Sequence, residues 1–335
     1  MKIYIQRLAF SLAAALLPTL GPAQNLFVSG SPGVYEITPD GTQSLFASNL
    51  FSSSGLAFDS AGNLFVAAES ASGSSSYIYK YTPGGTQSTF VSGVVNPNGL
   101  AFDSAGNLFE AEDGGVVHEF TPSGTKTTFT PGFSDAFGLA FDSAGTLFIT
   151  DYDFGNICKL TSGGARVIFG TAHVPTGLAF DGSGNLFAAD SYYGNIYKYA
   201  PDGTRSTFAS GLSFAYGLAF DASGNLFAAD SGSGNIYKYT PDGTRSTFAS
   251  GLSHPGFLAF KPIPPTLGQP VKSGTQFQFL LLGSSGQNYT VQVCTDLDSM
   301  NWQPVFVTNP PVNLFLVTVP NATNESCLYR ILLGP

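Results

Sequence analysis

Acidic side chains recur at one position along this sequence, where they could either bind a cation or anchor a loop. They follow short apolar runs at intervals of 39 or 40 residues: Glu112, Asp151, Asp190 and Asp230. Glu69 stands one place out of register, and Gly30 breaks the series. Carboxylates around one opening would hold Ca²⁺ or a similar divalent cation. An aspartate that begins a loop also bonds the backbone of its own turn, and we favour that structural role. We therefore predict no cofactor, with a divalent cation as the alternative.

Aromatic side chains form the second group, and two near-copies of one segment show where they vary. Residues 177–216 and 217–256 differ at seven of 40 positions, and five of these differences fall in expected loops on one face. The aromatic and histidine residues of such loops are Tyr152, Phe154, Tyr192, Tyr193, Phe214, Tyr216 and His254, with Phe133 and His173 at corresponding places. Exposed rings there would bind a glycan, a peptide or a small apolar ligand. Unconstrained drift of loop sequences would give the same variation, so both interpretations stay open.

Repeats of about 40 residues position these side chains. The motif Gly-Leu-Ala-Phe begins at Gly55, Gly99, Gly138, Gly177 and Gly217, and a degenerate copy begins at Phe257. Each copy belongs to a unit of four short apolar runs separated by turns rich in Gly, Asp and Pro. Six such units predict an all-β fold, a six-bladed β-propeller with four-stranded blades.

The two ends of the repeat array predict how the ring closes. The array begins on a second strand at Asn25 and finishes on a first strand at Phe257. One blade must therefore combine a C-terminal first strand with three N-terminal strands, which removes exposed blade edges. The turn from Asp59 to Asn63 recurs on the face opposite the variable loops, with Asp to bond its own turn and Gly for a left-handed position.

The repeat sequence resembles a known group of propellers. The motif GLAFDxxGNLFxAD followed by NIYKYTPDG is similar to the NHL-repeat and gluconolactonase-like (regucalcin-type) families, over about residues 25–260. This resemblance implies a ring of loops around a central channel, and it is far more specific for fold than for activity.

The resemblance also implies candidate sites for an enzyme. Pro97-Asn98-Gly99-Leu100 matches the motif in which gluconolactonase-like enzymes place a metal-binding Asn, and Asp135 is the candidate for a missing acidic ligand. A related lyase that opens streptogramin antibiotics uses a His on this kind of face, which makes His173 and His254 candidate general bases. His118 replaces a strand Tyr of the sister repeats, and we interpret it as structural.

The segments outside the repeats have different compositions. Residues 1–23 have the pattern of a signal peptide, with Lys2 and Arg7 ahead of an apolar stretch. The propeller is predicted over 24–260, a Pro-rich linker over 261–269, and a small antiparallel β-sandwich over 270–335. In that last segment, the sequence from Gly286 to Gln292, Asp296-Leu297, Trp302 and Tyr329-Arg330 resemble a small domain that often ends secreted bacterial proteins. Cys294 and Cys327 could pair after export, whereas Cys158 is expected to be a packed free thiol.

Charge narrows the classes of partner. A net charge of −9 without clusters of Lys and Arg argues against nucleic acid or an anionic membrane. No segment is long and apolar enough to predict a transmembrane helix. The sequence thus predicts a monomeric, secreted, periplasmic or cell-surface propeller that recognises an extracellular protein, a glycan or a small molecule without catalysis. A gluconolactonase-like, metal-dependent lactonase or hydrolase is the alternative, followed by a lyase of the streptogramin type.

Overall fold

The computed structural model describes residues 24–263 except 51, 70–75 and 162–164, together with seven strands of the C-terminal region. The described part of the chain divides into two compact units, one comprising residues 24–261 and the other the C-terminal strands. The predicted signal peptide lies outside the described residues. No helix suited to crossing a membrane occurs in the described part of the chain.

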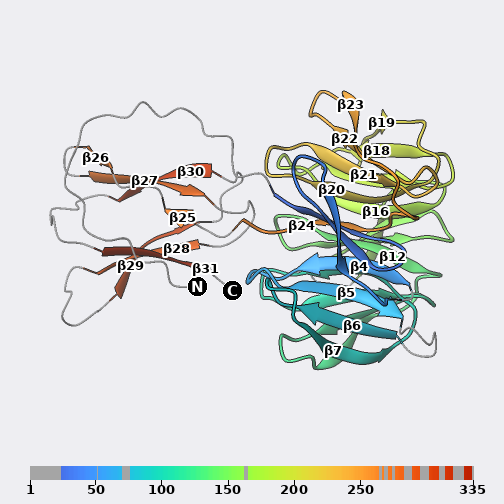
Figure 1. Ribbon diagram of the computed structural model, residues 1–335, viewed down its shortest axis with the longest axis horizontal. Coiled ribbons are helices and arrows are strands. Elements are labelled where there is room, and N and C mark those ends of the chain that lie inside the picture. Colours follow the sequence, from blue (N-terminus) through green and yellow to red (C-terminus); the bar gives the residue numbers. More distant parts are fainter. Residues whose placement is uncertain are drawn as a thin grey trace. The chain divides into compact units, whose positions relative to one another are not determined.

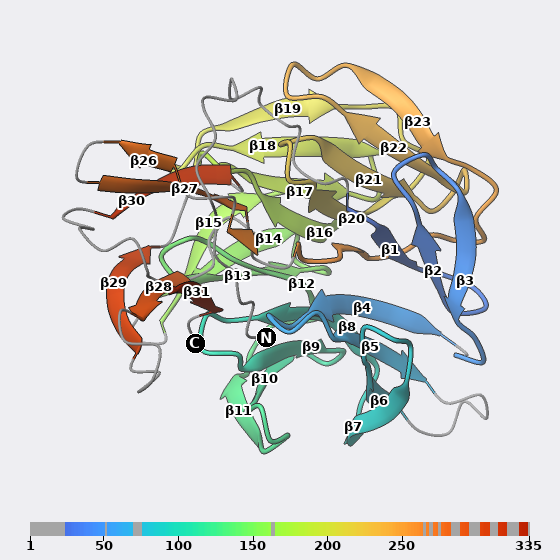
Figure 2. The ribbon, with the colours of Figure 1, turned by 60° about the vertical axis from the view of Figure 1, so that its left-hand side comes forward.

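Residues 24–261 form six four-stranded antiparallel sheets arranged around a common axis, as Figures 1 and 2 show. The predicted six-bladed, all-β propeller is therefore confirmed. Three blades are β4(Ser53–Phe58), β5(Leu64–Glu69), β6(Ser76–Tyr81), β7(Gln87–Val94); β8(Pro97–Phe102), β9(Leu108–Glu112), β10(Val116–Phe120), β11(Lys126–Thr130); and β12(Ala136–Phe141), β13(Leu147–Asp151), β14(Asn156–Leu160), β15(Arg166–Thr171). Two more are β16(Pro175–Phe180), β17(Leu186–Asp190), β18(Asn195–Tyr199), β19(Arg205–Ala209); and β20(Ala215–Phe220), β21(Leu226–Asp230), β22(Asn235–Tyr239), β23(Arg245–Ala249).

The sixth blade joins the two ends of the array. Its strands are β24(Leu258–Phe260), β1(Leu26–Ser29), β2(Val34–Ile37) and β3(Gln43–Ala47), hydrogen-bonded in that order. Leu26 pairs with Phe260 and Val28 with Leu258. The predicted closure by one C-terminal and three N-terminal strands is therefore confirmed.

Glycine in the Gly-Leu-Ala-Phe motif lets the innermost strands approach one another. A Cβ atom added at Gly99 would lie 2.4 Å from the backbone oxygen of Phe137, and one added at Gly177 would lie 2.4 Å from that of Tyr216. Backbone atoms cannot move aside as a flexible side chain can. The recurring glycine is therefore a packing requirement at the axis.

Phenylalanine from each second strand connects neighbouring blades. Phe65 packs edge-to-face on Phe90 of its own blade and on Phe102 of the next blade, with ring centroids 5.0 Å apart in both pairs. The same arrangement recurs in all six blades, with centroid separations of 4.9–5.1 Å. Each pair contributes about 0.5–1.5 kcal/mol beyond the burial of its area. These Phe–Phe contacts thus hold neighbouring blades together.

The turns between first and second strands have the predicted chemistry. The carboxylate of Asp181 accepts hydrogen bonds from the backbone N–H groups of Ser183 and Asn185 and from the Asn185 side chain. Gly184 in this turn has φ +81°. These turns lie at the ends of the blades opposite the loops that join second to third strands.

The C-terminal unit contains two small antiparallel sheets. One comprises β25(Thr266–Leu267), β26(Val271–Ser273), β27(Gln276–Leu282) and β30(Leu314–Val319), and the other β28(Tyr289–Cys294), β29(Trp302–Thr308) and β31(Leu328–Leu333). The five longer strands agree with the apolar runs of the sequence, whereas β25 lies within the segment predicted as a linker and β26 was not predicted. Cys327 and the side chain of Cys294 lie outside the described residues, so their pairing remains a prediction.

Candidate functional site

The loop face comprises the loops from second to third strands and the loops from fourth strands to the next blade. At its centre, rings from three innermost segments pack together: Phe137, Tyr216 and Phe257. Their centroids are 5.4–5.7 Å apart. Burial raises the pKa of Tyr216. Aromatic rings therefore occupy the axis on this face, and Tyr216 belongs to this packed group together with Tyr152, whose ring lies 5.2 Å from Phe137.

The other predicted aromatic residues are exposed on consecutive loops around the ring. The exposed fractions are 70 % for Phe154, 65 % for Tyr192, 58 % for Tyr193 and 42 % for Phe214. Phe133 differs from the expectation, because it is buried and lies beneath the guanidinium group of Arg166. We call Phe154, His173, Tyr192, Tyr193 and Phe214 the aromatic rim.

Three members of the aromatic rim contact one another directly. His173 stacks on Tyr192 with centroids 4.3 Å apart and an interplanar angle of 19°. Tyr193 lies edge-on to both, at 5.1 Å from His173 and 5.0 Å from Tyr192. The sequence placed these residues on one face, and the structure brings their rings into one cluster.

The two loop histidines have no ring contact with a carboxylate within the described part of the chain. The His173 ring lies on tyrosines, and the Nδ1 atom of His254 is 3.3 Å from the Ser253 hydroxyl. His254 has φ +49°, which places it in a tight turn. The geometry therefore supplies neither histidine with the oriented acid that a general base commonly uses.

The acidic series anchors loops, as favoured from the sequence, but it reaches further than each residue's own turn. Asp190 accepts hydrogen bonds from Tyr192 and Tyr193 in its own turn and from the backbone N–H groups of His173 and Val174 in the preceding loop. Asp230 likewise accepts bonds from the preceding loop, at Ser213 and Phe214. Asp151 does so at Ser134. Asp190 and Asp230 thus hold the loops that carry His173, Tyr192, Tyr193 and Phe214.

Asn98 lies at the axis, where its amide joins two blades. It donates a hydrogen bond of 3.1 Å to the carbonyl of Ala136 in the next blade. Ser54 and Thr176 occupy the same register position and donate to the carbonyls of Pro97 and Ala215. Asn98 thus shares a structural role with two hydroxyl residues.

Asp135 is the carboxylate beside Asn98, with 3.4 Å between its Oδ1 atom and Asn98 Nδ2. Burial, reinforced by nearby acidic residues, raises its pKa to about 6. The structure therefore brings together the two residues predicted from the gluconolactonase resemblance. The positions equivalent to Asn98 in the other five blades carry Ser54, Phe137, Thr176, Tyr216 and Gly256.

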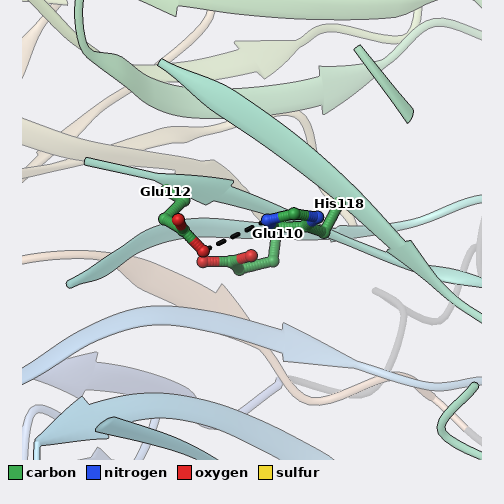
Figure 3. A group of neighbouring side chains, drawn as sticks. All are labelled: Glu110, Glu112 and His118. Carbon is green, nitrogen blue, oxygen red and sulfur yellow. Dashed lines mark ion pairs between the residues drawn. The ribbon is translucent and has the colours of Figure 1, made fainter. Parts of the chain in front are cut away.

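Glu112 departs from the rest of the acidic series. Its Oε2 atom lies 3.1 Å from His118 Nε2 and 3.6 Å from Lys126 Nζ. Figure 3 shows the side chain of Glu110 pointing toward the same place. One oxygen or nitrogen from each of Glu110, Glu112 and His118 lies within 4.8 Å of the others. Among the described residues, this is the group of acidic, His or Cys side chains that could hold a metal ion.

Glu110 is the functional candidate that sequence reasoning missed. It is fully buried, and neither carboxylate oxygen has a hydrogen-bond partner in the described structure. Burial, with a contribution from the charge of Glu112, raises its pKa to about 8. Burial also lowers the pKa of His118. The available signal was the repeat itself, because Glu110 stands where the near-copies have Ala188 and Ala228.

Comparison with solved structures gives a consistent result for the fold. A chain of the nidogen/laminin complex superposes with a TM-score of 0.64 at 18 % identity, covering 72 % of this chain and 99 % of the other. The protein has a β-propeller fold. A gluconolactonase-like protein superposes with a TM-score of 0.53 at 18 % identity, covering 66 % and 83 %. Virginiamycin B lyase from Staphylococcus aureus gives 0.50 at 11 % identity, covering 84 % and 95 %. No protein-family profile and no curated protein matches the sequence.

Proposed function

We propose that this protein is an exported recognition module that binds a glycan through the aromatic rim. The observation that carries the proposal is the exposure of Phe154, Tyr192, Tyr193 and Phe214 on one arc of one face. Large exposed aromatic groups gathered on loops are typical of binding surfaces. Tyr and His rings offer an apolar surface beside polar groups, and a sugar ring has matching C–H and hydroxyl groups.

The carboxylates beneath the rim support recognition because they hold its loops in place. Asp190 and Asp230 accept backbone hydrogen bonds from the loops that carry His173 and Phe214. A loop fixed before the ligand arrives loses less conformational entropy on binding. Export rests on the signal-peptide pattern of residues 1–23, and it would place the rim in contact with extracellular ligands.

The near-copy of the same loop offers a matched variant. Gly232 and Ser233 occupy the positions of Tyr192 and Tyr193, so the double substitution Tyr192→Gly/Tyr193→Ser converts one loop into its sister. We expect the wild type to bind at least one glycan on an oligosaccharide array. The Kd for that glycan should be higher in this variant by at least about tenfold.

Gly182→Ala is the control, because it also copies the sister repeat but lies in a turn of the opposite face. It should bind as the wild type does. Equal binding by the wild type and the loop variant would refute the aromatic rim as the site. Binding of proteins or peptides, with no oligosaccharide bound, would refute the glycan as its ligand.

A metal-dependent lactonase is the second candidate, and one observation favours it: Asp135 lies beside Asn98 at the axis. A divalent ion bound there would polarise a lactone carbonyl. Hydrolysis of a lactone panel that requires added metal and disappears in Asp135→Asn would support this activity. Absence of turnover with every divalent ion tested would leave recognition as the function.

A further inference from the structure

The interface between the blades β4–β7 and β8–β11 carries Glu110 and His118 where the near-copies have Ala and Tyr, and Lys126 where they have Arg. Glu110 faces His118 across the β9–β10 pair, where other blades pair Ala188 with Tyr197 and Ala228 with Tyr237. Lys126 begins β11 where the near-copies have Arg205 and Arg245. These two arginines lie over the tyrosine rings, at 4.7 and 4.9 Å from the centroids.

Glu110 and His118 lie between two blades rather than on an exposed surface. Alternation along β9 and β10 puts Glu110 and His118 on the same face as Leu108 and Phe120. Leu108 and Phe120 pack against Phe65 and other apolar residues of the neighbouring blade. Glu110 and His118 therefore lie in the interface between two blades, where the other blades have apolar and aromatic contacts.

The burial of Glu110 without a hydrogen-bond partner indicates that a ligand belongs beside it. A buried carboxylate without a partner is destabilising, and native proteins pair such a group or bind a metal with it. Here the Glu110 side chain is fully buried, both oxygens lack a partner among the described residues, and it points at Glu112.

We propose that Glu110, Glu112 and His118 bind one divalent cation of the first transition series, with Zn²⁺ as the probe. An imidazole combined with two carboxylates suits Zn²⁺, whereas Ca²⁺ requires six to eight oxygen ligands. Bonds of about 2.0–2.2 Å would bring tetrahedral ligand atoms to about 3.4 Å from one another. The present separations, within 4.8 Å, need only small side-chain rotations to reach this value.

Lys126 is the group that competes with the cation. Its ammonium lies 3.6 Å from Glu112, and its side chain is 35 % exposed. A flexible lysine at the surface can turn into solvent when a cation replaces it. Glu112 and His118 have side-chain exposures of 14 % and 9 %, so the cation enters beside Glu112.

The decisive experiment uses the full chain after chelator treatment, with zinc affinity measured in competition with a chromophoric chelator. We expect one Zn²⁺ per chain and a thermal midpoint that rises with zinc concentration, because a ligand of the folded state stabilises it by mass action. The double variant Glu110→Ala/His118→Tyr restores the pair found in the sister blades, so it should fold. It should lose saturable zinc binding and the zinc-dependent rise in midpoint.

A second variant separates this site from other histidines. The chain has three histidines, and His173→Gln/His254→Gln changes the two outside the site, so its zinc affinity should equal that of the wild type. Absence of stoichiometric zinc in the wild type would overturn the proposal and leave Glu110 as a protonated structural group. Equal zinc binding by the sister-blade double variant would overturn it too. The control variant changes His173 of the aromatic rim, so its glycan binding is not compared, and the two overturning results concern zinc alone.

Discussion

The blades β8–β11 and β16–β19 share one backbone plan but differ in what they bury. His118 pairs with Glu110 in the first, and Tyr197 pairs with Ala188 in the same register in the second. One interface thus holds ionisable groups where the other holds a methyl group and an aromatic ring. Both blades share the axial glycine, the interblade phenylalanines and the turns. They differ in chemistry at the interface position of Glu110 and Ala188.

The first prediction tests whether the two blades share the same framework at the axis. Gly99→Ala and Gly177→Ala should each destabilise the chain by about 4 kcal/mol or more, because each Cβ atom would overlap a backbone oxygen of the next blade. Chemical denaturation would measure both losses. Gly211→Ala is the control: it has φ +80° but open space around it, so it should lose only about 1–2 kcal/mol. A tolerant Gly99 beside a sensitive Gly177 would show that the blades differ in framework as well.

The second prediction moves the acidic group into the other blade. Ala188→Glu should destabilise the chain by about 3 kcal/mol at pH 8, because Ala188 is fully buried among apolar side chains and Arg205, which lies over the Tyr197 ring, already donates to the carbonyl of Thr171. Ala188→Met adds a side chain of similar length without charge and separates crowding from ionisation. If the two variants had equal stabilities at pH 8, the buried charge would not be the cause.

The third prediction concerns pH. The folded pKa of Glu110, about 8, lies above its ordinary value of 4.5, so the native state retains a proton that the unfolded state releases between these values. Stability from this group is therefore fully present below about pH 4.5 and falls as the pH rises toward 8. In the presence of a chelator, urea denaturation of Glu110→Gln should show a shallower decline over this range than the wild type. Parallel declines would mean that Glu110 ionises freely in the folded protein.

The smallest effect is expected at the aromatic rim. Tyr192→Gly/Tyr193→Ser should change the free energy of unfolding by no more than about 0.5 kcal/mol, because both side chains are mostly exposed. A thermal melt would measure it alongside the glycan assay. A large loss of stability would show that the ring cluster with His173 is a structural element of the loop face.

The repeat pattern predicted the fold because each strand and turn recurs with few substitutions. The Gly-Leu-Ala-Phe motif, as at Gly99, identified the innermost strand of each blade. The turn that begins at Asp59 identified the face opposite the variable loops. The sequence also placed Tyr192 and Tyr193 on exposed loops. It could not show that Phe133 is buried, because its ring joins an apolar cluster with Phe109 and Ile149 from two blades. Nor could it show that Asn98 bonds across to Ala136, because that contact joins separate blades.

Glu110 illustrates a different limit. It is a single acidic residue within a strand and belongs to no recognisable sequence motif. Its possible role as a ligand depends on Glu112 and His118, which the pairing of β9 and β10 brings beside it. Comparison of the repeats position by position would have marked it as the acidic residue at a place where the near-copies have alanine. What the comparison could not supply is its burial without a partner.

Anomalous diffraction at the zinc edge, from crystals of the full chain grown with Zn²⁺, tests the difference between these blades most directly. We predict one strong peak at about 2.0–2.2 Å from an oxygen of Glu110, an oxygen of Glu112 and the Nε2 atom of His118, with Lys126 turned away. The interface that contains Ala188 and Tyr197 should show none. A wild-type crystal with no peak between the three residues, and with Glu112 still paired to Lys126, would contradict the account.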